Sequence, residues 1–583
     1  MPFSDHSLRT AAGLTVAGLL FAGPFFAAPR AVGEEIFVER AAAAGLDFVH
    51  FTGATGKLFF PEIAGAAGAL LDYDGDGDLD VFLAQGTMLG DEQDPKKAKI
   101  PPRGKLPPSD RLYRNDLSVL PNGERRLSFT EVTAESGLAA STGYGMGAAA
   151  GDYDGDGHVD LYVTNFGSNV LWRNRGDGTF EDVTQKAGAD DPRWSVSAVF
   201  FDADGDGHLD LYVGNYVDFQ PAKKVPCLDT TGRVDYCGPK SYPPEPDRLL
   251  HNRGDGTFVD ITAAAGLAAP GPALGVAATD FDGDGRIDLF VANDGEPNFL
   301  WMNQGDGKFI DEGLFRGTAV NGDGRAEASM GVDAADFDGD GDEDLFMTHL
   351  DGETNTLYLN DGAGQFLDAS TARGVGAPSF SMTGFGTAWL DYDNDGHRDL
   401  LAVNGAVKTI PAQRDAGVAF PFEQRNQLLH NDGKGTFREV TDLAGKAFQL
   451  SEVSRGAMVG DLDNDGDPDV VVTNGEGPVR LLINQIGARA AWLGVEPWAG
   501  QGTALNARVE VRPKTGAALW GRSRPGGSYA SSGDPRVLLG LGARKGPYEV
   551  RVYWPSGGVE RWPEVAANAY TRLVRGTGET VSP

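Results

Sequence analysis

Carboxylates that recur at one fixed spacing are the residues of this chain most able to do chemistry. The pattern D-x-D-x-D-G-x-x-D occurs seven times, at residues 72–80, 152–160, 202–210, 280–288, 336–344, 391–399 and 461–469. Carboxylates on alternating residues of a tightly turned loop can converge on one hard cation, and Ca²⁺ takes about six to eight oxygens at about 2.3–2.6 Å. The Gly at position six permits the sharp turn. The pattern therefore predicts up to seven calcium sites.

Within each predicted site, positions 1, 3, 5 and 9 supply side-chain oxygen and position 7 supplies a backbone carbonyl, so the side chain at position 7 is free to vary. The predicted metal-site residues are Asp72, Asp74, Asp76, Asp78, Asp80, Asp152, Asp154, Asp156, His158, Asp160, Asp202, Asp204, Asp206, His208, Asp210, Asp280, Asp282, Asp284, Arg286, Asp288, Asp336, Asp338, Asp340, Asp342, Asp344, Asp391, Asp393, Asp395, His397, Asp399, Asp461, Asp463, Asp465, Asp467 and Asp469. No loop carries a Ser, a Cys or a free general base. We therefore expect the calcium to hold each turn together rather than to act in catalysis.

An EF-hand is the main alternative for these loops, because its calcium loop begins in the same way. That loop ends with a bidentate Glu at position twelve and lies between two helices. Position twelve is apolar in every copy here: Leu83, Val163, Val213, Val291, Met347, Val403 and Val472. The EF-hand hypothesis is therefore rejected. Ligation by oxygen alone favours calcium over zinc or copper, and magnesium prefers rigid octahedral sites that keep several waters.

The acidic loops also bear on the charge of the whole chain. It has 84 acidic and 50 basic residues, a formal net charge of −34, which would repel nucleic acid and anionic membrane surfaces. Four carboxylates in each of seven loops make up 28 of the acidic residues, and seven divalent ions would bring the net charge to −20. Without metal, each cluster repels itself. We therefore expect raised carboxylate pKa values or lower stability in the metal-free protein.

The segments around each loop have the character of β-strands. Successive loops start 80, 50, 78, 56, 55 and 70 residues apart, so one basic unit recurs with three insertions. In the third unit, residues 195–201, 209–215, 248–252 and 257–262 are rich in β-branched and aromatic residues, and Gly, Asn and Asp mark the joints. Four short strands repeated seven times predict an all-β fold, a seven-bladed β-propeller.

The seventh unit lacks its closing strand after Asn484, whereas a near copy of that strand, FVERAAAAGL, stands at residues 37–46 before the first loop. We expect this N-terminal strand to complete the seventh blade and so to remove the open sheet edges. The predicted propeller spans residues 34–486. Residues 487–580 contain further strands separated by Gly and Pro turns, which predict a small β-sandwich or barrel.

The N-terminus has the layout of a secretory signal peptide. Arg9 precedes an apolar run at residues 11–22, which is followed by Gly23-Pro24 and several Ala residues. This run is shorter than the about 20 residues that a membrane-spanning helix needs. We therefore expect residues 1–31 to be a signal peptide and the protein to be secreted or placed in the periplasm or at the cell surface. Cys227 and Cys237, the only cysteines, then predict a local disulfide.

Three long insertions, at residues 86–110, 216–247 and 405–426, all follow the second strand of their unit. In a propeller they fall on the face opposite the acidic loops, which makes that face the predicted binding surface. The second strands also end in a recurring amide or imidazole: Gln85, Asn165, Asn215, Asn293, His349, Asn404 and Asn474. A ring of such groups could hold a polar ligand, but we favour a role in capping the backbone of the turn. His251 and His430 are interpreted as blade packing, in place of Trp172 or Trp301.

The repeats, over about residues 34–486, resemble the FG-GAP/VCBS repeats of integrin alpha-chain propellers. The C-terminal part is similar to the ASPIC/UnbV domain, on the segments ARVEV at 507–511, GSY at 527–529, SGDPR at 532–536, GLG at 540–542 and WPSG at 554–557. One departure is Leu505-Asn506, where that family usually has a Gly before its Ala-Arg-Val segment. Together the two parts resemble the cartilage acidic protein family and its bacterial relatives. The resemblance implies calcium in the acidic loops and an exported protein of adhesion or matrix type.

The leading prediction is thus a non-enzymatic interaction, adhesion or scaffold module, a monomer that recognises a protein or a glycan. A polysaccharide lyase or hydrolase on a propeller scaffold is the alternative, because the fold alone does not decide function. A lyase needs a cluster of Lys, Arg, Tyr or His in its cleft. The negative charge and the presence of only eight His weigh against it.

Overall fold

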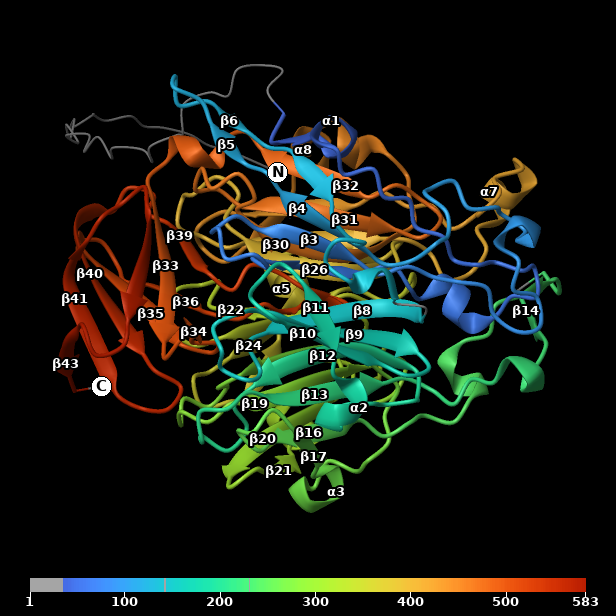
Figure 1. The fold of residues 1–583 in the computed structure, drawn as a ribbon, viewed down its shortest axis with the longest axis horizontal. Coiled ribbons are helices and arrows are strands. Elements are labelled where there is room, and N and C mark those ends of the chain that lie inside the picture. Colours follow the sequence, from blue (N-terminus) through green and yellow to red (C-terminus); the bar gives the residue numbers. More distant parts are fainter. Residues whose placement is uncertain (1–34, 141–142, 230, 583) are drawn as a thin grey trace, which may run out of the picture. The chain divides into compact units, whose positions relative to one another are not determined.

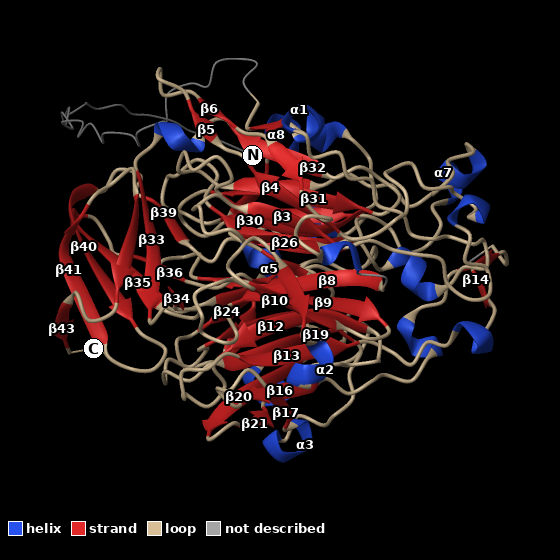
Figure 2. Ribbon diagram, viewed as in Figure 1, coloured by secondary structure: helices blue, strands red, loops and turns tan. Residues whose placement is uncertain are grey.

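The computed structural model describes residues 35–140, 143–229 and 231–582, and the predicted signal peptide lies outside them. The described chain is all-β and propeller-like, with short helices between the strands (Figure 2). The helices are α1 (Ala41–Ala44), α2 (Thr184–Ala187), α3 (Thr262–Ala265), α4 (Gly313–Arg316), α5 (Ser370–Arg373), α6 (Gly376–Ser379), α7 (Pro411–Asp415) and α8 (Thr441–Ala444), with 3₁₀ turns at Phe60–Ile63, Pro95–Lys97, Leu138–Ala140, Pro221–Lys223, Pro239–Ser241, Lys446–Gln449 and Gly487–Arg489. None of the described helices is long and apolar enough to cross a membrane.

Each acidic loop joins the first two strands of one antiparallel sheet, in which four strands follow one another and each is hydrogen-bonded to the next. The seven sheets are, first, β2 (Gly68–Leu71), β3 (Asp80–Leu83), β4 (Arg111–Asn115) and β7 (Phe129–Glu131); second, β8 (Tyr144–Gly151), β9 (Asp160–Phe166), β10 (Val170–Asn174) and β11 (Phe180–Asp182); third, β12 (Ser195–Phe201), β13 (Asp210–Asn215), β16 (Arg248–Asn252) and β17 (Phe258–Asp260); fourth, β18 (Ala273–Thr279), β19 (Asp288–Asn293), β20 (Phe299–Gly305) and β21 (Lys308–Asp311); fifth, β22 (Val332–Ala335), β23 (Asp344–Met347), β24 (Thr356–Asn360) and β25 (Phe366–Asp368); sixth, β26 (Gly384–Leu390), β27 (Asp399–Asn404), β28 (Gln427–Asn431) and β29 (Phe437–Glu439); and seventh, β30 (Ser454–Gly460), β31 (Asp469–Asn474), β32 (Arg480–Asn484) and β1 (Phe37–Glu39). Strands β30, β31 and β32 lie side by side in Figure 1.

The fourth strand of the seventh sheet is β1, which precedes all the other strands in the chain. Strand β1 pairs antiparallel with β32, with Phe37 opposite Asn484. Helix α1 follows β1 and ends at Gly45 with φ +89°, just as α2 follows β11 and ends at Gly188 with φ +72°. The residues 37–46 therefore repeat the local structure that closes the other units.

The first strands of the sheets contact one another in chain order from β2 through β8, β12, β18, β22 and β26 to β30, and β30 also contacts β2. Apolar side chains fill the space between neighbouring sheets. Between the seventh and first sheets, Met458 and Val471 belong to the same buried cluster as Leu70 and Val81. The hydrophobic core is thus divided into successive layers, one between each pair of sheets.

The C-terminal residues form two further sheets. One contains β34 (Gly502–Thr503), β33 (Trp492–Ala499), β39 (Val537–Gly540) and β42 (Tyr570–Val574), and the other contains β36 (Leu519–Arg522), β35 (Arg508–Thr515), β40 (Lys545–Tyr553), β41 (Val559–Val565) and β43 (Glu579–Val581). Asn506, at the departure from the family pattern, has φ +66°. Asn tolerates this left-handed conformation better than most residues, so it can replace the usual Gly at the turn.

The short strands β37 (Gly526–Gly527) and β38 (Ser531–Ser532) leave the C-terminal sheets and enter the repeats. Strand β38 pairs in parallel with β2, with Ser532 opposite Ala69. The intervening residues contact four more first strands: Ser528 O accepts from Val332 N at 3.0 Å, Ser528 Oγ accepts from Thr387 N at 3.2 Å, Ala530 O accepts from Ala148 N at 3.1 Å, and Ala530 N donates to Ser197 Oγ at 3.0 Å. We call residues 526–532 the inserted segment. The sequence predicts a separate C-terminal domain, and this insertion was not expected.

The inserted segment meets the three long insertions in one aromatic cluster. Its Tyr529 is fully buried, packs edge-on against Phe385 and donates to Ala64 O at 2.8 Å. The same cluster contains Tyr216 and Phe422 from the insertions. The structure also joins Cys227 and Cys237 in a disulfide, as predicted. Two short hairpins lie outside the sheets described above. They pair β5 (Ser118–Val119) with β6 (Arg125–Arg126), and β14 (Cys227–Leu228) with β15 (Val234–Asp235).

Candidate metal loops and an adjoining cavity

The acidic loops are folded by hydrogen bonds from their own backbone to the first carboxylate. In the first loop, Asp72 Oδ1 accepts from Gly75 N at 2.8 Å and from Asp76 N at 3.1 Å, and Oδ2 accepts from Gly77 N at 3.0 Å. Gly77, at position six, has φ +92°, and all its counterparts also have positive φ. The predicted sharp turn is therefore present in every loop, and it requires Gly for this conformation.

The carboxylate at position nine fixes each loop to the third strand of its own sheet. Asp80 Oδ1 accepts from Asn115 N at 2.8 Å, and Oδ2 accepts from Tyr73 N at 2.9 Å. The other six Asp residues at this position bind the same Asn backbone N–H at 2.7–2.9 Å. The Asp at position nine thus holds its loop in place through hydrogen bonds. Only the carboxylate lone pairs that these bonds leave free can bind a cation.

The Asn whose backbone N–H binds position nine also joins its loop to the loop of the neighbouring sheet. Its Nδ2 donates to the backbone carbonyl at position two of that loop, at 2.7–3.2 Å. The pairs are Asn115 with Leu462, Asn174 with Tyr73, Asn252 with Tyr153, Asn303 with Ala203, Asn360 with Phe281, Asn431 with Phe337, and Asn484 with Tyr392. Each loop therefore accepts one hydrogen bond from the Asn of a neighbouring sheet and is also bound by the Asn of its own sheet. The seven loops form one continuous hydrogen-bonded series.

Several buried carboxylate oxygens in these loops have no hydrogen-bond donor among the described residues. They are Asp154 Oδ1, Asp280 Oδ1, Asp282 Oδ1, Asp342 Oδ1, Asp344 Oδ2, Asp393 Oδ1 and Asp467 Oδ1. In the first and second loops, carboxylate oxygens at positions 1, 3 and 9 lie within 4.8 Å of one another. Buried oxygens without donors are costly unless a cation compensates them. The donor set and its convergence therefore fit a hard cation such as Ca²⁺.

The electrostatics of the loops point the same way. Burial, together with the nearby Asp282 and Asp280 carboxylates, raises the pKa of Asp288 to about 8. Burial and the charges of Asp338 and Asp342 raise the pKa of Asp344 to about 9. A raised carboxylate pKa means that the folded protein disfavours the charged form when no cation is bound. Raised pKa values in the metal-free loops were the expectation from sequence.

The seven loops differ in what stands beside them. In the second loop, Arg173 Nε lies 2.5 Å from Asp154 Oδ2 and its Nη2 lies 2.8 Å from Asp156 Oδ2, so a guanidinium already compensates part of this cluster. The interpretation of His251 and His430 as packing residues in place of Trp is wrong. Both occupy the position of Arg173, and their Nδ1 atoms lie 3.0 Å from Asp210 Oδ1 and 3.1 Å from Asp399 Oδ1. They face the acidic loops because side chains alternate along the strand.

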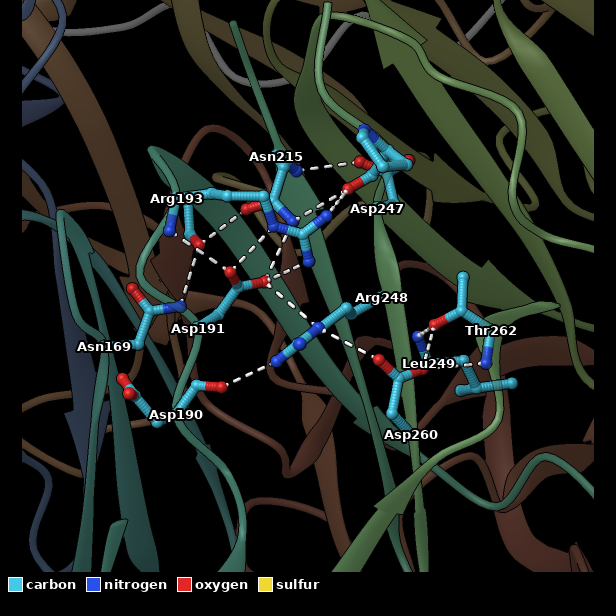
Figure 3. Close-up of polar contacts among 12 residues, drawn as sticks. Asn169, Asp190, Asp191, Arg193, Asn215, Asp247, Arg248, Leu249, Asp260 and Thr262 are labelled. Carbon is cyan, nitrogen blue, oxygen red and sulfur yellow. Dashed lines mark hydrogen bonds and ion pairs between the residues drawn. The ribbon is translucent and has the colours of Figure 1, made fainter. Parts of the chain in front are cut away.

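The amides that end the second strands serve the backbone, as we favoured. Nδ2 of Asn165, Asn293 and Asn474 donates to a carbonyl of the turn that follows, at 2.8–3.0 Å, and Nδ2 of Asn404 donates to Arg425 O at 2.8 Å, near the end of the insertion at 405–426. Asn215 is part of a larger network (Figure 3), in which its Nδ2 donates to Asp191 Oδ2 at 3.0 Å and Arg193 Nη2 lies 2.6 Å from the same oxygen. The Nδ2 donors of these amides are thus used by the protein itself, whereas Oδ1 of Asn165, Asn293 and Asn404 and both ring nitrogens of His349 are buried without a hydrogen-bond partner among the described residues.

A cavity of about 500 Å³ lies where the fourth to seventh acidic loops meet the C-terminal residues. Its lining includes five arginines: Arg398, Arg508, Arg522, Arg524 and Arg536. None of the five was predicted from the sequence. The sequence does hold one sign of this cavity, at position eight of the acidic loops. That position is Leu, Val or Ile in the first four loops and is Glu343, Arg398 and Pro468 in the last three. The sequence predicts a binding surface on the face opposite the acidic loops. The described cavity lies beside these loops and does not test that surface, which stays a prediction.

Comparison with known protein families agrees with this architecture. Residues 72–163, 152–213, 228–291, 280–347, 336–402 and 415–485 match the model of the FG-GAP-like repeat, and residues 499–580 match that of the ASPIC and UnbV family. Similar curated proteins are cartilage acidic protein 1 from Mus musculus, at 27% identity over 436 residues, and from Homo sapiens, at 26% over 438 residues. Both matches cover 71% of this chain, which spans only 62% and 60% of those proteins.

Among solved structures, the chain is similar to a lectin of Agrocybe aegerita that recognises non-reducing terminal N-acetylglucosamine, with 15% identity and a TM-score of 0.37 over 71% of this chain and 86% of the lectin. It is also similar to YCF48 bound to a D1 peptide, with 10% identity and a TM-score of 0.39 over 78% of this chain and 97% of that one. The family matches, which extend over most of the repeats and the C-terminal part, show that the chain belongs to the FG-GAP-like repeat proteins and carries a C-terminal ASPIC and UnbV domain.

Proposed function

We propose that this protein is an exported, calcium-binding, seven-bladed β-propeller that serves as an interaction, adhesion or scaffold module for a protein or glycan partner. The observation that carries the proposal is the continuous series of loop-to-loop hydrogen bonds. Because Asn115 in the first sheet bonds Leu462 in the seventh loop, the series returns to its start. The contact of β30 with β2 and the pairing of β1 with β32 support the same closed ring of blades.

Calcium is proposed as a structural ion at up to seven loops. The support is the set of buried loop oxygens without donors and the raised carboxylate pKa values, both of which a bound divalent cation would relieve. The sites need not be equal, since Arg173 already occupies part of the second cluster. We therefore expect the second loop, and likewise the fourth loop, where Arg286 and Arg316 lie against Asp284 and Asp282, to bind calcium more weakly than the first loop.

The test is the metal content of the purified protein, together with thermal melting in calcium and in a calcium chelator. We expect several bound calcium ions per chain and a clearly lower melting temperature in chelator, because a ligand that binds only the folded state stabilises it. A metal-free protein that melts at the same temperature in both buffers would contradict the proposal.

The proposed limits are a signal peptide at residues 1–31, a propeller at 34–486 and an ASPIC/UnbV-like domain at 487–580. Export is supported by the N-terminal sequence and by the disulfide between Cys227 and Cys237, which suits an oxidising compartment. A polysaccharide lyase remains the second candidate, because the cavity presents arginines that could face an acidic sugar. Among its described lining residues there is no Lys, His or Tyr to act as base, which favours binding over elimination.

A further inference from the structure

One position beside the acidic loops differs in chemical type from sheet to sheet. It is the residue that precedes the Asn whose backbone N–H binds position nine. From the first sheet to the seventh, this residue is Arg114, Arg173, His251, Met302, Leu359, His430 and Ile483. The seven loops therefore do not offer the same set of donor atoms to a cation.

The apolar residues at this position add no nitrogen donor to their loops. Met302, Leu359 and Ile483 stand beside the fourth, fifth and seventh loops. Each of these three loops contains a buried carboxylate oxygen without a hydrogen-bond donor among the described residues. A set of oxygen donors without imidazole is what Ca²⁺ prefers.

The histidine of the third sheet adds an imidazole nitrogen to the carboxylates of its loop. His251 Nδ1 lies 3.0 Å from Asp210 Oδ1 and 3.6 Å from Asp204 Oδ2. One ligand atom from each of these three residues lies within 4.8 Å of the other two. The third loop thus presents nitrogen and oxygen donors to one point.

The sixth loop repeats this arrangement. His430 Nδ1 lies 3.1 Å from Asp399 Oδ1 and 3.1 Å from the Tyr392 hydroxyl. Ligand atoms of Asp393, Asp395 and His430 lie within 4.8 Å of one another. Asp393 Oδ1 is buried and has no hydrogen-bond donor among the described residues. A cation bound between these groups would compensate that oxygen.

The spacing of nitrogen and oxygen is that of two ligands on one transition metal. Zn²⁺ binds imidazole nitrogen and carboxylate oxygen at about 2.0–2.2 Å, so two neighbouring ligands lie about 3.0–3.5 Å apart. The separations of His251 from Asp210 and of His430 from Asp399, 3.0 Å and 3.1 Å, fall in this range. Imidazole suits Zn²⁺, Cu²⁺ and Ni²⁺, whereas Ca²⁺ takes oxygen ligands.

We propose that the third and sixth acidic loops are mixed nitrogen and oxygen sites that hold a divalent transition cation such as Zn²⁺ in the presence of Ca²⁺, with His251 and His430 as ligands. The inference rests on the proposed function, in which the acidic loops are metal sites, and it assigns a different metal to two of them. The other five loops, which have no imidazole at this position, keep calcium as their proposed ion.

The experiment dialyses the full chain against excess calcium chloride with a small amount of zinc chloride and then measures both metals per chain by elemental analysis. We expect about two zinc ions per chain to stay bound, because imidazole ligands favour Zn²⁺ over Ca²⁺. Calcium is counted first, in buffer without zinc. A chain that binds no calcium contradicts the proposed function, whereas a chain that binds calcium but no zinc contradicts this inference alone.

His251→Gln and His430→Gln each remove one imidazole. Each change should weaken one zinc site by about 100-fold or more in calorimetric titration, because even changes around metal ligands cost about 10–100-fold in affinity. The calcium content in zinc-free buffer should not fall, since Ca²⁺ needs no nitrogen ligand.

His158→Gln is the matched control. His158 also belongs to an acidic loop, but it stands at position seven, where the backbone carbonyl is the predicted ligand, and Arg173 takes the place of the imidazole beside that loop. We expect His158→Gln to retain both zinc ions. Melting temperatures in calcium confirm that all three variants are folded.

Two results would overturn the inference. One is complete displacement of zinc from the natural protein by excess calcium. The other is zinc binding in His251→Gln and His430→Gln that equals binding in His158→Gln. That result would show that the two imidazoles only donate hydrogen bonds to Asp210 and Asp399 and that zinc binds elsewhere.

Discussion

Asn115 donates a hydrogen bond from Nδ2 to the carbonyl of Leu462, 2.8 Å away and 347 residues later in the chain. The Asn115 side chain is 1% exposed, so its loss leaves buried carbonyls without a donor. We expect Asn115→Ala to reduce the free energy of unfolding by about 1–3 kcal/mol in denaturant titrations with calcium. Asn122→Ala, at an exposed hairpin position, should change it by less than about 0.5 kcal/mol. Equal stabilities for the two variants would contradict the proposed closure of the ring by this bond.

Deletion of residues 34–46 removes β1 and α1 and exposes the edge of β32. Phe37 is fully buried and lies 5.9 Å from the Phe448 ring, so the deletion also opens the apolar layer beside it. We expect a lower melting temperature and aggregation through the free strand edge. Scanning calorimetry and light scattering measure both, with a chain that lacks only residues 1–31 as the control. Unchanged melting and solubility would refute closure by the N-terminal strand.

Tyr529 of the inserted segment provides a test of how strongly the C-terminal domain is held. We expect Tyr529→Ala to cost about 3–5 kcal/mol of stability, as large-to-small changes at buried aromatic residues do. Tyr529→Phe, which loses only the bond to Ala64 O, should cost about 1 kcal/mol. Urea unfolding of both variants checks the order. A Tyr529→Ala protein as stable as Tyr529→Phe would show that the segment is not anchored by this ring.

Much of this architecture could be predicted from sequence because it depends on local chemistry that repeats. The acidic loops, the positive φ at Gly77 and its counterparts, and the copy of the closing strand at residues 37–46 are all encoded by neighbouring residues. The inserted segment could not be predicted, because β37 and β38 are two residues long and have no strand periodicity of their own. The arginines of the cavity were hidden for another reason: they come from distant parts of the chain, and only the packed structure brings them together.

The stability of the metal-free protein should depend on pH in a direction opposite to that of ordinary acidic residues. Burial raises the pKa of Asp288 to about 8 and that of Asp344 to about 9, well above the value of about 4 in an unfolded chain. Their contribution to stability is therefore complete below about pH 4 and is lost as the pH rises through 8 and 9. In chelator, the melting temperature should fall between pH 6 and pH 9.

Asp344→Asn is the control for this pH dependence, because it keeps the shape of the side chain and cannot ionise. It should flatten the decline in chelator, while calcium should abolish the decline in the natural protein. A melting temperature in chelator that stays constant or rises from pH 6 to pH 9 would be incompatible with protonated loop carboxylates in the metal-free state.

Incubation with a panel of acidic and neutral polysaccharides separates the two proposed functions. We expect no new unsaturated or reducing ends from the calcium-loaded protein, since the described cavity lining offers no Lys, His or Tyr base. Absorbance of unsaturated products and a reducing-end assay provide the measurement, with a known lyase as the positive control. Products that form with the natural protein and disappear in Arg398→Met would favour the enzymatic alternative.

The insertion of residues 526–532 among the first strands has a consequence for the order of folding. Strand β2 gains its parallel partner β38 only when Ser532 is available, and β1 must wait for β32. The earliest and latest parts of the chain therefore depend on each other, and long-range pairing of this kind slows folding and leaves sheet edges exposed meanwhile. A chain that ends before residue 532 therefore leaves β2 without this parallel partner until the C-terminal residues have been made.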